Sequence, residues 1–297
     1  MGRNILPSKM TPWRAGGKLG PMDREDLVIG KKTRTVAVGG AAIHLAEWGE
    51  GRPLLLLHGN PDSALMWDGV APLLAAHFHC LAPDLPGFGG SEVPSDFASS
   101  LAGMAAFVEA LRTAAAIEGP LDLAGHDFGG PFALAWALRH PEKVRRIVLI
   151  NTVFFSDYHW HFWARVWRTP VLGEVAMALL NRPLFARELR RNGLGPAHIA
   201  RTWAHITPRM KRMALRLYRA ADPAAFAPWE GKLPALVAQK PTLVLWGDRD
   251  PYIAPRFAGR FGAAAVVHLP AVGHWPPVEA PAETAAHMLR HLTADRV

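Results

Sequence analysis

Three residues that could act together in a nucleophilic reaction each follow a short apolar stretch of the chain. Asp127 lies between Gly125 and Gly129 in LAGHDFGGPF, at the spacing of a nucleophile elbow, G-x-S-x-G, with aspartate in place of serine. Asp250 follows LVLWG, and His274 follows VVHLPAVG. A carboxylate nucleophile, an acid and a histidine base in this order suit hydrolysis through a covalent ester.

The aspartate at the elbow selects the kind of carbon that is attacked. A carboxylate can attack an sp³ carbon, displace a halide or open an epoxide, and remain bound as an alkyl ester. Water activated by His274 would then hydrolyse the ester on Asp127. Helix N-capping is the alternative role for Asp127 taken alone, but the flanking glycines and the histidine motif favour catalysis.

The elements that must position these residues alternate between strands and helices. Six short runs rich in Leu, Val and Ile predict buried parallel strands, over residues 52–59, 78–84, 121–126, 145–151, 241–247 and 264–270. Two runs before them, 35–40 and 42–48, alternate apolar and polar residues and predict an antiparallel hairpin. Ligands bind beyond the carboxyl ends of parallel strands, which is where Asp127, Asp250 and His274 lie.

The pattern divides the chain into a core and an insertion. Residues 153–236 lack a comparable strand signal and show helical spacing with many Trp and Arg residues, which predicts a helical cap inserted after the sixth strand. The predicted α/β core comprises residues 31–152 and 237–297. Residues 1–30 predict a flexible N-terminal extension.

Composition limits the partners and the compartment. The chain has 297 residues, 50% of them hydrophobic, and its net charge of +8 is spread over predicted helix faces without a nucleic-acid motif. One cysteine, Cys80, excludes a cysteine-based metal cluster. No signal-peptide core and no run of ~18 apolar residues is present. We expect a cytoplasmic monomer or homodimer that binds a small apolar substrate and water, without metal, cofactor, nucleic acid or membrane.

Five motifs in order carry a resemblance to a known family over about residues 35–295. They are HGNP (58–61), PDLPGFGGS (83–91), GHDFGG (125–130), WGDRD (246–250) and GHW (273–275). The chain resembles the α/β-hydrolase fold, and within it the haloalkane dehalogenases, fluoroacetate dehalogenases and epoxide hydrolases. The resemblance implies a mostly parallel eight-stranded sheet flanked by helices, with a helical cap after the sixth strand.

The same resemblance assigns the acid and the oxyanion hole. In this family the acid usually closes a G-x-x-D turn, which favours Asp250 over Asp248. Some relatives place the acid after the preceding strand, but this chain has Asn151 there, and an amide cannot neutralise an imidazolium. The resemblance implies that the backbone N–H groups of Asn60 and Phe128 form the oxyanion hole.

The residues for the leaving group support two enzymatic hypotheses. Many haloalkane dehalogenases hold the halide with the Asn60 side chain and with a Trp after the nucleophile, where this chain has Phe128. His159, Trp160 and Tyr218 resemble the halide-binding set of fluoroacetate dehalogenases. Tyr218, followed by an arginine, equally resembles the epoxide hydrolase tyrosine that donates a proton to the epoxide oxygen.

We rank three functions from these residues. The first is hydrolytic dehalogenation, which Asn60 and the set of His159, Trp160 and Tyr218 support. Its substrate should be a neutral halogenated aliphatic, because Phe128 occupies the position of the Arg with which fluoroacetate dehalogenases hold a carboxylate. The alternative is an epoxide hydrolase that forms a diol. The third is a hydrolase-fold protein that only binds a ligand. The presence of all three catalytic candidates, Asp127, Asp250 and His274, argues against it.

Overall fold

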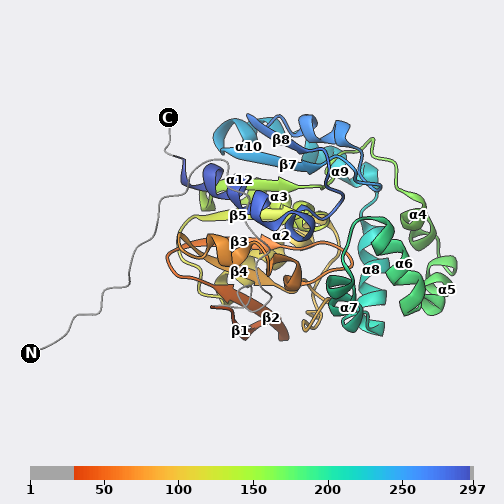
Figure 1. The fold of residues 1–297 in the computed structure, drawn as a ribbon. Helices are drawn as coiled ribbons and strands as arrows, with labels where there is room; N and C mark the ends of the chain where they lie inside the picture. The colour runs from red at the N-terminus through yellow and green to blue at the C-terminus, as the bar shows by residue number, and fades with distance from the viewer. Residues whose placement is uncertain (1–29, 295–297) are drawn as a thin grey trace, which may run out of the picture.

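A single sheet of eight strands organises the computed structural model, which describes residues 30–294 (Figure 1). The strand order is β1-β2-β4-β3-β5-β6-β7-β8. Strand β2 runs antiparallel to β1 and β4, and the other neighbouring pairs are parallel. The strands are β1 Lys32–Val38, β2 Ala41–Trp48, β3 Arg52–Leu57, β4 Phe78–Pro83, β5 Leu121–His126, β6 Val144–Ile150, β7 Thr242–Gly247 and β8 Ala265–Leu269. The predicted mostly parallel eight-stranded sheet is confirmed; the extension predicted over 1–30 lies outside the described residues, except for Gly30.

Two apolar layers cover the sheet. In β3, Leu55 and Leu57 pack into one cluster with residues of α2 and α3, whereas Leu54 and Leu56 pack into the other with residues of α1 and α12. Because both faces are buried, the central strands read as unbroken apolar runs. The flanking helices are α1 Ala71–Leu74, α2 Leu101–Ala114, α3 Gly129–Arg139, α11 Pro276–Glu279 and α12 Pro281–Thr293.

A helical region follows β6, as predicted. Its helices are α4 Phe162–Arg168, α5 Leu172–Leu179, α6 Arg182–Arg191, α7 Pro196–Ala204, α8 Pro208–Ala220, α9 Pro223–Glu230 and α10 Leu233–Gln239. Helices α4 to α8 gather at one end of the sheet in Figure 1, where α4 and α5 both contact α8. Helix α10 instead contacts α3 of the core. The last part of the inserted segment therefore belongs to the layer that covers the sheet.

Within residues 30–294, no helix combines the length and the apolar character that crossing a bilayer requires.

Candidate active site

The backbone at Asp127 makes a sharp turn between β5 and α3. Asp127 has a φ of 48°, a conformation that non-glycine residues seldom adopt outside functional turns. A Cβ at Gly125 would lie 2.5 Å from the Gly129 carbonyl oxygen, and one at Gly129 would lie 2.1 Å from that of Leu57. Thr152 Oγ1 donates to the Asp127 carbonyl oxygen at 2.6 Å. The two glycines are thus required by the close approach of neighbouring backbone.

Backbone donors surround the Asp127 carboxylate. Its Oδ2 accepts the Asn60 N–H at 2.8 Å, and the Phe128 N–H also bonds to the carboxylate. Burial raises the pKa of Asp127 to about 6, although His274 and these two N–H groups oppose the shift. The two predicted oxyanion donors are therefore next to the carboxyl carbon at which an ester would be hydrolysed.

His274 and Asp250 form a buried pair beside Asp127. His274 Nδ1 lies 2.7 Å from Asp250 Oδ2. Burial disfavours the imidazolium, but the carboxylates of Asp250 and Asp127 outweigh burial and raise the pKa of His274. Because Nδ1 donates to Asp250, Nε2 of the neutral ring keeps a lone pair, which a general base requires.

Asp250 is held from several sides. Its Oδ1 accepts the N–H groups of Tyr252 at 2.7 Å and Ile253 at 3.0 Å, and Oδ2 accepts Asn151 Nδ2 at 2.8 Å. Burial opposes ionisation, but His274 and these donors lower the pKa of Asp250 below its usual value. Asp248 instead contacts the half-exposed His268 at 2.6 Å. The geometry thus places Asp250, not Asp248, against the histidine, and gives Asn151 the part of a supporting donor.

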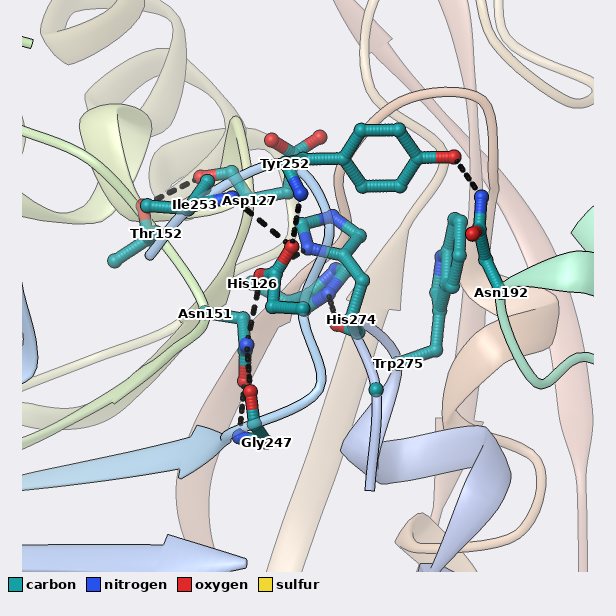
Figure 2. Close-up of polar contacts among 12 residues, drawn as sticks. His126, Asp127, Asn151, Thr152, Asn192, Gly247, Tyr252, Ile253, His274 and Trp275 are labelled. Atoms are coloured by element: carbon teal, nitrogen blue, oxygen red, sulfur yellow. Dashed lines mark hydrogen bonds and ion pairs between the residues drawn. The ribbon is translucent and has the colours of Figure 1, made fainter. Parts of the chain in front are cut away.

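A second histidine supports the loop that carries His274. His126, the last residue of β5, is fully buried, and its Nε2 lies 2.7 Å from the His274 carbonyl oxygen (Figure 2). Because a carbonyl oxygen can only accept a hydrogen bond, Nε2 must carry the proton. The other ring nitrogen, Nδ1, has no hydrogen-bond partner among residues 30–294. Burial lowers the pKa of His126 to about 3, so the ring is neutral. His126 was not among the predicted site residues, because the GHDFGG motif draws attention to its glycines and its aspartate.

A cavity of about 580 Å³ opens above the Asp127 carboxylate. Its walls include His274 from the core and Tyr218 from α8. Of the predicted leaving-group residues, Asn60, Trp160 and Tyr218 line this cavity, whereas His159 is exposed and does not. His159 lies in the segment before α4, where its side chain turns to solvent, so the predicted set is only partly assembled.

Hydrogen bonds decide which of these groups remain free to donate. Trp160 Nε1 donates to the Ala221 carbonyl oxygen at 3.2 Å and is therefore already engaged. The Tyr218 hydroxyl accepts from Asn60 Nδ2 at 3.4 Å and donates to no group among residues 30–294, so its own proton is available. The Tyr218 ring meets Phe128 edge to face, with centroids 4.9 Å apart. The cavity therefore presents the Tyr218 hydroxyl close to the nucleophile turn.

His161 is a cavity residue that was not predicted from the sequence. Its Nδ1 accepts the Ala164 N–H at 3.3 Å and so caps α4. Burial lowers the pKa of His161 to about 4, so the ring is neutral and Nε2 carries the proton. A histidine directly before a helix can act as a cap, and that signal could have found it. The Tyr-His-Trp resemblance instead favoured His159, which lies two residues earlier.

No cluster of three or more His, Cys, Asp or Glu side chains that could hold a metal ion occurs in the described part of the chain. At the Asp127 turn, the structure brings together a carboxylate, a histidine base with its acid, and two backbone N–H donors. Together these groups can form and hydrolyse an ester.

Comparison with known proteins identifies the family. A family model described as alpha/beta hydrolase fold matches residues 52–281. Haloalkane dehalogenase 2 of Mycobacterium tuberculosis (strain ATCC 25618 / H37Rv) is 31% identical over 261 residues, which cover 83% of this chain and 90% of the relative. An epoxide hydrolase of Caballeronia sordidicola is 25% identical, with coverage of 92% and 97%.

A solved structure supports the same assignment. The crystal structure of haloalkane dehalogenase DbeA from Bradyrhizobium elkani USDA94 superposes with a TM-score of 0.75 at 28% identity, and the match covers 87% of this chain and 96% of that one. The family match, the relatives and the shared fold all extend over most of the chain. The chain therefore belongs to the alpha/beta hydrolase fold family, as a hydrolase of the haloalkane dehalogenase and epoxide hydrolase type.

Proposed function

We propose that the protein is an epoxide hydrolase that forms an alkyl ester on Asp127. A carboxylate oxygen of Asp127 attacks one ring carbon, and the carbon–oxygen bond of the epoxide breaks. The electron pair goes to the epoxide oxygen, which takes the proton of the Tyr218 hydroxyl. The product of this step is a hydroxyalkyl ester of Asp127 and a Tyr218 phenolate.

The second step hydrolyses this ester. His274 Nε2 takes a proton from water, whose oxygen attacks the ester carbonyl, and the N–H groups of Asn60 and Phe128 stabilise the oxyanion. His274 then gives its proton to the departing product oxygen. The proton of the Asp127 acid restores the Tyr218 hydroxyl, so epoxide and water become a vicinal diol.

The state of the leaving-group donors is the observation that carries this proposal. Phe128 has no N–H on its side chain, Trp160 already donates to a carbonyl, and His159 is exposed. Tyr218 retains a free proton, and burial together with the Asp127 charge raises its pKa well above the usual value. Tyr218 therefore keeps its proton until a stronger base, the developing alkoxide, takes it. The neutral His161 adds an N–H donor to the same cavity.

Haloalkane dehalogenation is the second candidate, and two observations favour it. The Asn60 side chain lines the cavity with its amide nitrogen toward Tyr218, and could hold a halide instead. The relative named haloalkane dehalogenase 2 is also more similar to this chain than the one named epoxide hydrolase. A halide leaves without a proton and needs several hydrogen-bond donors whose contacts tighten as its charge develops. In this cavity the Trp160 N–H is already engaged and His159 is exposed, so neither of them can assist Asn60 in holding a halide.

A trapping experiment separates the two reactions. The His274→Gln variant should form the ester and fail to hydrolyse it, because it lacks the general base. After incubation with a terminal epoxide, intact-protein mass spectrometry should show a gain equal to the whole epoxide. With the matching bromoalkane, an adduct would instead gain the alkyl group and lose bromide.

Peptide mapping should place the adduct on Asp127, and the double variant with Asp127→Asn is the control that should remain unmodified. An adduct from the bromoalkane alone would select the dehalogenase. An unmodified His274→Gln protein with both compounds, while the wild type turns one of them over, would exclude the covalent mechanism.

A further inference from the structure

The exposed apolar side chains of the protein are concentrated in one place. In the described part of the chain, all the large hydrophobic side chains that are exposed lie between residues 162 and 184, on α4, on α5 and the residue before it, and on α6. They are Phe162, Trp163, Val171, Leu172, Val175, Leu179 and Leu184. Contiguous exposed apolar surface in a soluble protein usually marks a binding site.

Most of this patch belongs to the wall of the active-site cavity. Five of its members line the same cavity as Asp127, namely Trp163, Leu172, Val175, Leu179 and Leu184. Leu179 is 69% exposed and Leu184 is 53% exposed. The cavity therefore runs from the buried carboxylate to the surface between α5 and α6 along one apolar wall.

Polar groups on this wall are few and lie on α6. Arg187, Glu188 and Arg191 line the cavity there. Glu188 is near Asn192 and the Tyr252 hydroxyl, each at 3.4 Å. The α5 residues that line the cavity, by contrast, carry no hydrogen-bonding side chain, so the part of a ligand that lies against α5 meets an apolar surface.

The backbone at the start of α5 is strained. Val171 has a φ of 68° and is 74% exposed. A β-branched residue in this conformation is unfavourable. Although Val171 belongs to the exposed patch, it is not among the residues that line the cavity.

We infer that the substrate carries a long alkyl chain, whose reacting carbons lie at Asp127 and whose tail extends along α5 and α6 to the surface. This inference rests on the proposed function, because the tail must be attached to the group that Asp127 attacks. Leu172, Val175, Leu179 and Leu184 form the tail subsite. The tail covers apolar surface that is exposed when the cavity is empty.

Chain length should therefore control specificity. Full burial of one methylene gains ~0.8 kcal/mol, equivalent to a factor of about four. The tail subsite is half open, so kcat/KM should rise by roughly twofold per methylene. The rise should continue until the chain passes Leu179 and should then level off.

The experiment measures kcat/KM for terminal epoxyalkanes from epoxybutane to epoxydodecane. The variant is Val175→Thr, which keeps the shape of the side chain and places a hydroxyl in the wall. Its ratio of long-chain to short-chain kcat/KM should fall by roughly threefold to tenfold. The matched control is Val171→Thr, the same change on an exposed residue that does not line the cavity, and its ratio should equal that of the wild type.

The outcomes separate this inference from the proposed function. Turnover of epoxybutane with no gain on lengthening the chain leaves the epoxide hydrolase standing and overturns the tail subsite. Equal effects of the two threonine variants also overturn it, because the whole patch, and not the cavity wall, would then set the preference. If no epoxide is turned over, the same series of bromoalkanes tests the tail subsite with the other leaving group. Chain-length dependence there would support it, and its absence would overturn it.

Discussion

The two sides of the active-site cavity are built in different ways. On the strand side, Asp127, Asp250 and His274 are buried, and each is held by hydrogen bonds from neighbouring loops. On the side of the inserted helices, the wall consists of aromatic and aliphatic side chains, several of them exposed. The polar groups there include the Tyr218 hydroxyl, which meets Asn60 of the core at 3.4 Å. In the proposed reaction the strand side thus supplies the groups that form and hydrolyse the ester, whereas the helical side supplies the Tyr218 proton and the surface that meets the rest of the substrate.

The largest expected effect tests the strand side. Asp250→Asn should lower kcat by about 10⁴-fold, the scale known for this change in a catalytic triad. An amide at residue 250 would donate to His274 Nδ1 and leave the proton on Nε2, so the base would be lost. Pre-steady-state kinetics should show normal ester formation and slow hydrolysis.

Asp248→Asn is the matched control, since Asp248 contacts His268 outside the cavity, and its kcat should stay near that of the wild type. Reversed effects of the two variants would mean that Asp248 is the acid and that the G-x-x-D assignment of Asp250 is wrong.

The next effect tests the helical side. Tyr218→Phe should lower kcat/KM for epoxides by about 10²- to 10⁴-fold, the range of general acid catalysis, because the epoxide oxygen loses its proton donor. Asn60→Ala keeps the backbone N–H and should have little effect on epoxides. In a dehalogenase the order would be the opposite, with a loss of about 10²-fold for Asn60→Ala, comparable to one oxyanion donor.

The pH dependence of kcat/KM tests the ionisation of Asp127, the residue at which the two sides of the cavity meet. Asp127 must be ionised to attack, and its pKa is raised to about 6 by burial. We expect kcat/KM to fall about tenfold per pH unit below about 6. After alkylation Asp127 is uncharged, so it no longer raises the pKa of His274, and the base needed for the second step is released more readily. If kcat/KM began to fall only near pH 4, Asp127 would not be desolvated in solution, and its pKa would not be raised.

The smallest effect concerns how the helical side is attached to the core. His198 of α7 lies 2.7 Å from the buried Asp62, two residues after Asn60. Burial opposes both charges, but their attraction raises the pKa of His198 and lowers that of Asp62. Because the folded pKa of His198 exceeds its unfolded value, its contribution is complete below about pH 6.5 and is lost as the pH rises through the raised pKa.

His198→Gln keeps a hydrogen-bond donor but removes the charge, so it should lower the unfolding free energy by about 1–3 kcal/mol at pH 6 and less at pH 9. Thermal unfolding of both proteins at the two pH values measures this difference. His159→Gln, the same change at an exposed histidine, should alter neither value. A pH-independent loss in His198→Gln would show that the pair stabilises through packing alone.

The sequence predicted the strand side well because the chemistry there is tied to local patterns. Buried parallel strands read as apolar runs, and the residue after each run lies at the same sheet edge. Asp127 and His274 could therefore be placed from the amino-acid pattern alone. His126 could not be assigned a role, since its partner, the carbonyl of His274, is far away along the chain.

The helical side was predicted less well for a physical reason. Helical spacing shows that a residue faces inward, but not what its polar atom meets there. The Trp160 N–H is engaged by the carbonyl of Ala221, and this pairing depends on how α4 packs against the end of α8. The prediction named His159, whereas His161 lines the cavity, for the same reason. The turn before α4 determines which of the two histidines faces the cavity, and helical spacing does not reveal that turn.

The insertion point of the helical region, between β6 and β7, has an evolutionary consequence. Strands β6 and β7 are hydrogen-bonded neighbours, so the inserted segment leaves and rejoins the core at adjacent points. The ladder between the strands already holds these ends together, and the entropy of closing the loop grows only slowly with its length. Helices could therefore be gained, lost or exchanged here without refolding the core. Such a junction allows one reactive centre to acquire new substrates through recombination of the segment above it.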